Sequence, residues 1–355
     1  FFFVVCRNVN VEWRMAKHSH KDEPEIAGDC IRFPYPQGSF IGVTGRLRGS
    51  IIKAVLPHVI LTTLLSTIIT ILYHFNAFDW GDGKHILPRR AHIALLIPLA
   101  FLLIFRSSIG VSRYWEGRGV ATTYYNNIVD LLRKAVGYIQ GDDELAKDLR
   151  REFFANLMVL LSVMVDQSTG SPATVHKYTN VPHREARVLR KEESAQLVQV
   201  LATRLASVLA KAHACGRLGV RMMLLADEDL QETVQGFAAC QKIRTTPMPF
   251  PYVQMLNIYL LAICYTLSLT IVHEYTYITP IVNLVIVATI FGLNAIGVEI
   301  EDPFGSDDND FDLVKLEKDI YRTCRRILII RDGLSEIDVP VESRVQREKK
   351  IIYIN

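Results

Sequence analysis

The densest group of ligand-binding side chains lies near the C-terminal end, between Glu299 and Asp312. Seven carboxylates fall within these fourteen positions, and Pro303 and Gly305 bend the backbone among them. Oxygen ligands on a turn suit a hard cation such as calcium. The spacing is not that of an EF-hand, and the alternative is an acidic helix start, in which Asp side chains cap the helix and oppose its dipole. The residues alone leave both interpretations open.

A second group of residues could control the passage of ions. In the run Leu95–Arg106, three bulky apolar side chains recur every four residues: Ile97, Phe101 and Phe105. On a helix this spacing places them on one face, and we call them the apolar stripe. Rings of bulky apolar side chains gate channels by dewetting. The alternative, which is the more common role of such a stripe, is core packing or a lipid-facing surface.

Two residues beside the apolar stripe carry further chemistry. Pro98 removes a backbone donor and starts or kinks a helix, which would expose amide groups that can hold an anion. Arg106 follows the stripe directly. A charged side chain at membrane depth usually faces a protein interior or a water-filled cavity. One chain cannot enclose a pore with one stripe, so a pore requires a ring of subunits.

The composition narrows the class of protein. Of the 355 residues, 50% are hydrophobic and 22% are charged, which is typical of membrane spans alternating with polar segments. The net charge of +3 and the lack of a basic aromatic platform argue against a nucleic-acid partner. The six cysteines show no metal-binding spacing and are interpreted as free thiols. No GxSxG, P-loop or HExxH motif is present, so an enzyme is not predicted.

Four apolar segments could cross a bilayer and position the stripe. They are Ala54–Tyr73, Ile93 to about Ser112, Met248–Val272 and Tyr275–Val298. Each is close to the length that a helix needs to cross the hydrocarbon core. Basic residues before the first segment place that end in the cytoplasm, and four crossings return the chain there. We therefore predict an all-α, multi-pass integral protein of the plasma membrane or of an organelle membrane.

The segment between the second and third spans alternates charged residues with apolar residues at helical spacing. Its uncharged run Leu157–Val165 is too short to span a bilayer, so it predicts a buried helix in a helical cytoplasmic domain. The predicted regions are an N-terminal cytoplasmic segment (1–39), a first transmembrane pair with the stripe (40–113), the cytoplasmic domain (114–246), a second transmembrane pair (247–298), and the acidic stretch with a helix and tail (299–355).

Five short motifs resemble those of the bestrophin family of anion channels, and the likeness covers nearly all of residues 40–331. They are Arg48-Gly-Ser-Ile-Ile-Lys53, Leu96-Ile-Pro-Leu-Ala-Phe-Leu-Leu-Ile-Phe105, Ser112-Arg-Tyr-Trp-Glu116, Thr246-Pro-Met-Pro-Phe-Pro-Tyr252 and Asp302-Pro-Phe-Gly-Ser-Asp-Asp-Asn-Asp-Phe311. Each motif is moderately specific, whereas their shared order and spacing make a chance likeness improbable.

The resemblance implies a homopentamer in the lipid bilayer with a central pathway for chloride and other small anions. Ile97, Phe101 and Phe105 would form its hydrophobic neck. The resemblance also implies a second, cytoplasmic constriction, for which Met222, Leu224 and Leu225 are the candidates. Arg106 does not decide the sign of the permeant ion, because bacterial relatives that pass cations share it.

The same resemblance implies a calcium site in the acidic stretch. Its ligands would be Glu299, Asp302 through its backbone oxygen, Asp307 and Asp310. Bacterial and plant members carry a similar stretch without depending on calcium. Two other functions are kept as alternatives: a non-conducting membrane scaffold that anchors the helical domain, and a carrier for organic anions.

Overall fold

The computed structural model describes residues 45, 49–75, 89–170, 194–305 and 307–333. These residues form α-helices and one short 3-10 helix, and none of them lies in a strand, so the predicted all-α class is confirmed. The predicted N-terminal segment 1–39 and the tail beyond residue 333 lie outside the described residues.

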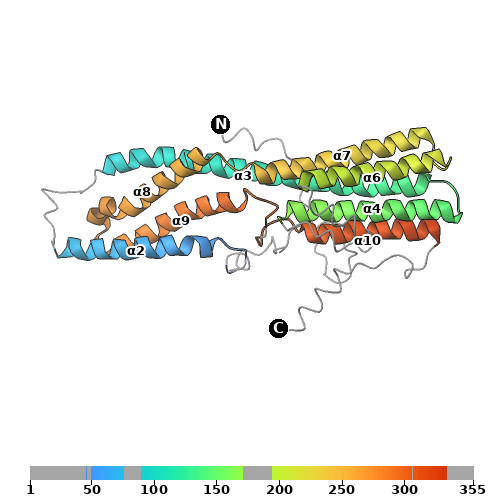
Figure 1. Cartoon of the computed structure of the whole chain (residues 1–355). Coiled ribbons are helices and arrows are strands. Elements are labelled where there is room, and N and C mark those ends of the chain that lie inside the picture. Colours follow the sequence, from blue (N-terminus) through green and yellow to red (C-terminus); the bar gives the residue numbers. More distant parts are fainter. Residues whose placement is uncertain (1–44, 46–48, 76–88, 171–193, 306, 334–355) are drawn as a thin grey trace, which may run out of the picture.

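One end of the molecule is built from apolar helices. Helices α2 (Ile52–His74), α8 (Phe250–Tyr275) and α9 (Thr279–Glu299) lie there beside the first part of α3 (Arg89–Tyr138), as Figure 1 shows. The short 3-10 helix η2 (Thr276–Ile278) joins α8 to α9. Three stretches of the described chain are long and apolar enough to cross a membrane: Ile52–His74, His92–Tyr138 and Val220–Glu299. The third stretch contains both α8 and α9.

Burial at this end is the reverse of that in a water-soluble bundle. Large apolar side chains such as Leu64 and Ile281 are exposed, whereas Thr62, Ser268 and Asn283 are buried between the helices. The Asn283 amide donates to the Thr62 carbonyl at 3.2 Å, and the Ser268 hydroxyl donates to Asn283 Oδ1 at 3.3 Å. Polar contacts between helices with apolar outer faces are typical of packing in lipid.

Helix α3 connects the apolar end to the rest of the molecule. It runs for 50 residues without interruption, which corresponds to a length of roughly 75 Å. The predicted boundary between residues 113 and 114 falls inside this helix. The membrane part and the following helical part are therefore joined by a rigid element and not by a linker.

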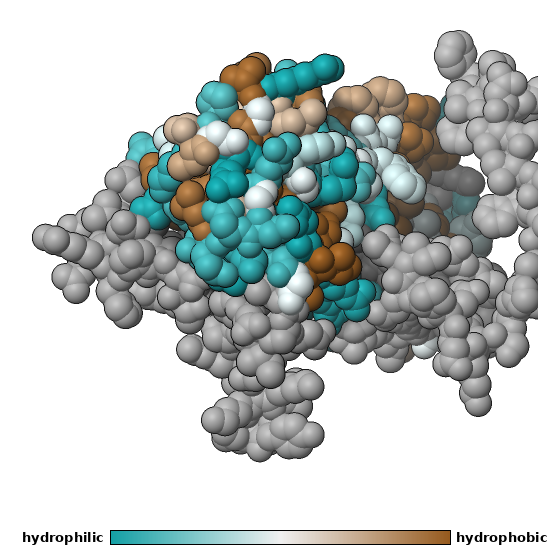
Figure 2. Space-filling model, turned by 90° about the vertical axis from the view of Figure 1, so that its right-hand side faces the viewer, coloured by the Kyte–Doolittle hydropathy of each residue, from teal (hydrophilic) through white to brown (hydrophobic). Residues whose placement is uncertain are grey.

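The second half of α3 belongs to a helical bundle that we call the distal bundle. Around it pack α4 (Glu144–Ser168), α6 (Ser194–Ala214), α7 (Val220–Thr245) and α10 (Leu313–Asp332). The run from residue 157 to residue 165 is fully buried in α4, which confirms its prediction as a buried helix. The end of the bundle seen in Figure 2 is mostly hydrophilic, with small hydrophobic patches.

The cysteines of the described residues are free thiols, as predicted. They are Cys215, Cys240, Cys264 and Cys324. Burial raises the pKa of the Cys324 thiol to about 12, so this side chain stays protonated at neutral pH. The distal bundle is thus held together by packing and polar contacts.

A buried ion pair closes the end of the distal bundle. Arg150 of α4 donates from Nε to Asp332 Oδ1 at 2.6 Å, and both side chains are fully buried. Its Nη1 also donates to the carbonyls of Ile139 and Gly141 at 2.9 and 3.0 Å. Arg150 therefore ties α4 to the end of α10 and to the connection that follows α3.

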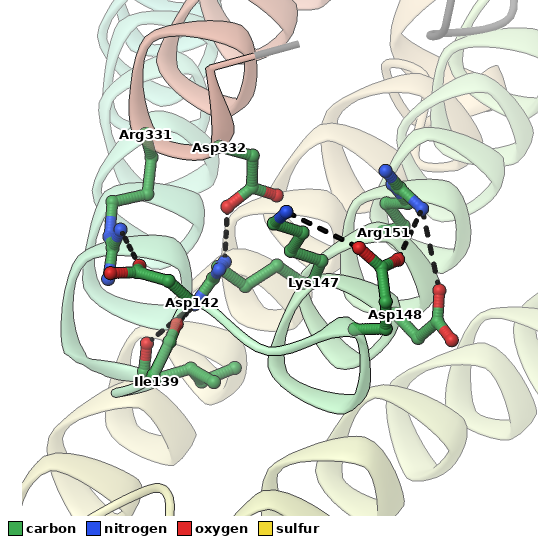
Figure 3. Close-up of polar contacts among 10 residues, drawn as sticks. Ile139, Asp142, Lys147, Asp148, Arg151, Arg331 and Asp332 are labelled. Atoms are coloured by element: carbon green, nitrogen blue, oxygen red, sulfur yellow. Dashed lines mark hydrogen bonds and ion pairs between the residues drawn. The ribbon is translucent and has the colours of Figure 1, made fainter.

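An exposed ion pair lies beside the buried one. Arg331 binds Asp142 at 2.8 Å, and the guanidinium lowers the pKa of that carboxyl (Figure 3). A lowered carboxyl pKa adds stability above the ordinary pKa, and this contribution is lost as the pH falls through the lowered value. The pair is therefore formed at neutral pH.

We expect Arg150→Ala to lower the free energy of unfolding by about 3–5 kcal/mol, because it leaves the Asp332 carboxylate buried and unpaired. Arg151→Ala is the matched control, since its pairs with Glu144 and Asp148 are solvent-accessible. Its loss should cost less than about 1 kcal/mol. Chemical denaturation of the detergent-solubilised protein measures both, and equal losses would contradict the assignment.

Candidate functional site

The apolar stripe lies on one exposed face of α3. Ile97, Phe101 and Phe105 are 70%, 68% and 46% exposed. Leu99 and Leu103, on the opposite face, are buried at 1% and 5% exposure, and they pack against α2, α8 and α9. Since the interior is filled by other residues of the helix, the stripe is not part of the chain's own core.

The two aromatic rings of the stripe support each other. Phe101 and Phe105 stack with centroids 6.3 Å apart, and Phe105 also contacts the ring of Tyr252 on α8 at 5.6 Å. The Tyr252 hydroxyl donates to the carbonyl of Leu102, which fixes α8 against α3 at this level. Phe105 is therefore held by Tyr252, Phe101 stacks on Phe105, and Ile97 is the most exposed of the three.

Pro98 does not start a helix. It lies inside α3, which begins at Arg89 and continues through it. A proline inside a helix removes one backbone donor and crowds the carbonyl four residues before it, which does not create a new helix start with its set of free amides. The prediction that Pro98 exposes a set of helix N-terminal amides is therefore wrong, although its side chain is exposed near the stripe.

Arg106 points away from the stripe. One residue after Phe105 lies about 100° around the helix, and the Arg106 side chain is only 5% exposed. Its guanidinium donates to Asn294 Oδ1 at 3.0 Å and to Glu301 Oε2 at 3.2 Å. In the single chain its positive charge thus faces the protein interior, paired with a carboxylate.

The exposed face of α3 continues beyond the stripe with polar residues, which the sequence analysis missed. At intervals of three or four residues it presents Ser108, Ser112, Trp115, Gly119, Thr122 and Asn126, four of which carry polar side chains. A spacing that alternates three and four residues past Phe105 would have found them, whereas the strict four-residue spacing of the stripe leads to Ile109 and Arg113. The same face therefore changes from apolar to predominantly polar along its length.

The three aperture candidates lie at the start of α7. Met222 packs against the core of the distal bundle, Leu225 is half-buried and Leu224 is exposed. Helix α7 runs antiparallel to α3, because Asp229 pairs with Lys134 at 2.7 Å whereas Lys242 pairs with Glu116 at 3.4 Å. Its start thus lies beside the far end of α3, roughly 50 Å along that helix from Phe105.

Two of the four predicted calcium ligands come together around Gly305. A Cβ atom on Gly305 would lie 2.8 Å from Asp310 Oδ2 and 3.5 Å from both the backbone oxygen and Oδ2 of Asp302. Asp310 is buried, and its Oδ2 accepts from the backbone N–H of Asp307. A glycine at this position leaves space between oxygens that could bind a hard cation.

Glu299 does not join that group of oxygens through its side chain. Its Oε1 accepts a hydrogen bond from Asn309 at 3.0 Å, and the same amide donates to the backbone oxygen of Gly49 at 3.0 Å. Within the described residues, no three His, Cys, Asp or Glu side chains are grouped as a metal site. The oxygens present around Gly305 therefore supply only part of a calcium coordination shell.

Asp312 plays the other role considered for the acidic stretch. Its side chain accepts from the backbone N–H of Lys315 at 2.9 Å and caps α10. Helix capping is thus confirmed for this residue. The capping residue Asp312 and the oxygens around Gly305 therefore lie in different parts of the acidic stretch.

The helical arrangement and the exposed stripe define a membrane protein of the bestrophin fold. The structure superimposes on a crystal structure of a bacterial bestrophin homologue from Klebsiella pneumoniae with a TM-score of 0.69 and 23% identity, covering 79% of this chain and 99% of that one. Residues 33–326 match the family of bacterial and fungal bestrophin proteins. The chain belongs to this family, which confirms the resemblance, the location as an integral membrane protein, and the prediction that it is not an enzyme.

Sequence relatives carry the name voltage-dependent anion channel-forming protein. One from Nostoc sp. is 28% identical over 76% of this chain and 85% of its own length. Another from Salmonella typhi is 24% identical over 78% of this chain and 88% of its own length. The likeness therefore extends over most of each relative, including both the membrane helices and the distal bundle.

Proposed function

We propose that this chain is the subunit of a homopentameric channel that passes chloride and other small anions, with the apolar stripe as its hydrophobic neck. The observation that carries the proposal is the stripe itself, which presents bulky apolar side chains outward while the opposite face of α3 fills the core. A ring of such faces would form a constriction that dewets when closed. The names of the sequence relatives support the same activity.

In this proposal α2, the first part of α3, α8 and α9 are four membrane crossings. Helices α8 and α9 form an out-and-back hairpin, because only the short η2 separates them. The distal bundle lies in the cytoplasm. The five regions predicted from the sequence then alternate between membrane and cytoplasm as described above. The change from membrane to cytoplasm then occurs partway along α3, with Pro98 and Arg106 on the membrane side.

The pathway continues along the polar face of α3. Ser108 and Ser112 line it just beyond the neck, and the start of α7 forms a second constriction at its far end. Leu224 is the best-placed of the three aperture candidates, because its side chain is exposed whereas Met222 contacts the distal core. The two constrictions would enclose a predominantly polar cavity.

We expect Phe101→Ala and Ile97→Ala to raise the open probability several-fold, because smaller side chains let water enter the neck. Single-channel recordings of the purified protein in planar bilayers measure this. Ile281→Ala is the matched control, since Ile281 is equally exposed but lies on α9. An open probability that is unchanged in both neck variants would remove the neck assignment.

Reversal potentials in asymmetric chloride test the sign of selectivity. An anion channel shifts its reversal potential toward the chloride equilibrium potential, and a shift toward the cation potential would overturn the proposed permeant ion. A protein that reconstitutes without any current would instead support the scaffold alternative. Saturable flux without unitary currents would support the carrier.

We further propose that calcium binds the acidic loop through Asp302 and Asp310, and that Asp307 and Glu299, whose Oε1 accepts from Asn309 in this structure, complete the ligand set. The oxygens grouped around Gly305 support this assignment. A bound ion would neutralise the repulsion between these carboxylates and stabilise the loop that follows α9.

We expect Asp307→Ala combined with Asp310→Ala to abolish any calcium-dependent increase in current. Calcium titration of the currents and of the thermal stability of the solubilised protein provides the measurement. Asp308→Ala serves as the control from the same loop. Wild-type currents and stability that do not respond to a calcium chelator would remove calcium from the proposal.

A further inference from the structure

Arg106 and the apolar stripe lie on opposite faces of α3 at the same level of the helix. The stripe is exposed, whereas the Arg106 side chain is buried against α9. Gly297 of α9 makes room for the aliphatic part of this side chain, because a Cβ on Gly297 would lie only 3.2 Å from Arg106 Cγ. The back of the neck helix is therefore fitted closely to α9 at this level.

Glu301 makes three contacts with two other segments of the chain. Its Oε2 pairs with Arg106 at 3.2 Å, its Oε1 accepts from the backbone N–H of Met248 at 2.9 Å, and its backbone oxygen accepts from Arg113 Nε at 3.0 Å. One residue at the end of α9 thus contacts α3 twice and the connection between α7 and α8 once. Both carboxylate oxygens of Glu301 are used.

Arg113 strengthens the same junction from α3. Its Nη1 donates to the carbonyl of Thr246 at 2.6 Å, and its Nη2 donates to the carbonyl of Ile243. These carbonyls belong to the end of α7 and the turn that leads to α8. Arg106 therefore holds α3 to α9 and the residues after it, and Arg113 holds α3 to the end of α7 and the turn that follows. Glu301 contacts both arginines.

The position of Glu301 in the chain connects its contacts with α3 to the acidic loop. It lies between the end of α9 and Asp302, the first residue of the turn around Gly305. A displacement of the acidic loop would therefore be transmitted to Arg106 and so to the helix that carries the stripe. Hydrogen-bonded ion pairs in a partly desolvated site are short and directional, which suits such a link.

We propose that Glu301 and Arg106 form a coupling junction that sets the position of the neck helix and hence the open probability, without placing charge in the ion pathway. This inference rests on the proposed channel function. Glu301 acts as a positioning residue, because it acts through α3 and lies behind the stripe. Arg106 lends no net positive charge to the neck, since its partner carries the opposite charge.

We expect Glu301→Gln and Arg106→Gln to change the open probability by about 5- to 150-fold, the range of typical coupling between sites. Single-channel conductance and the reversal potential in asymmetric chloride should stay at their wild-type values. The double variant should change the open probability no more than the larger single change, because both substitutions break one pair. Glu152→Gln, in an exposed pair with Lys211, is the matched surface control.

Asn294→Ala provides a milder variant in case the first two fail to fold. It removes one hydrogen bond to Arg106 and keeps the ion pair, so a smaller change in the same direction is expected. A reversal potential that shifts in Arg106→Gln would overturn the proposal by placing this charge in the pathway, while the channel itself would stand. Unchanged open probability in Glu301→Gln and Asn294→Ala would also overturn it. A wild-type protein without current would overturn the channel and this inference together.

Discussion

The structure depends on the continuity of α3. A single helix of 50 residues carries the stripe in its first part and forms part of the distal bundle with its second part. Because the helix is continuous, a movement of one part acts directly on the other. Its residues contact α4, α7, α8, α9 and α10. The position of this one helix therefore affects both the membrane helices and the distal bundle.

The two faces of α3 differ in the groups that they contact. The inner face buries leucines among the membrane helices and uses Arg106 and Arg113 where polar partners are available from α9 and from the turn before α8. The outer face exposes large apolar side chains where α3 lies among the membrane helices. Further along the helix this face becomes predominantly polar. A side chain on the inner face can therefore influence the outer face only by moving the helix, which separates residues that shape the neck from residues that position it.

Most of the fold was predictable from the sequence because its signal is strong. Apolar segments of bilayer length predicted α2 and the α8–α9 pair to within a few residues, and the four-residue spacing predicted that the stripe shares one face of a helix. The continuity of α3 beyond residue 113 was missed, because the rise in charge there indicates a change of solvent and not the end of a helix. The contacts of Glu301 and Asn309 could not be predicted, since they join residues far apart in the chain, and the pairing of Arg106 required the position of α9.

The pairing of Arg106 bears on what selects the ion. In a symmetric ring every arginine behind the neck would be accompanied by one Glu301, so the two sets of charge would cancel at distances beyond their separation. The neck would then contribute mainly a cost of dehydration, which is lower for large, weakly hydrated ions of either sign. Discrimination between anions and cations would consequently have to arise outside the neck, and the Ser108 and Ser112 hydroxyls are exposed polar groups on the same face of α3. The residues that set how readily the pore opens and those that set which ion passes would thus occupy different faces of one helix.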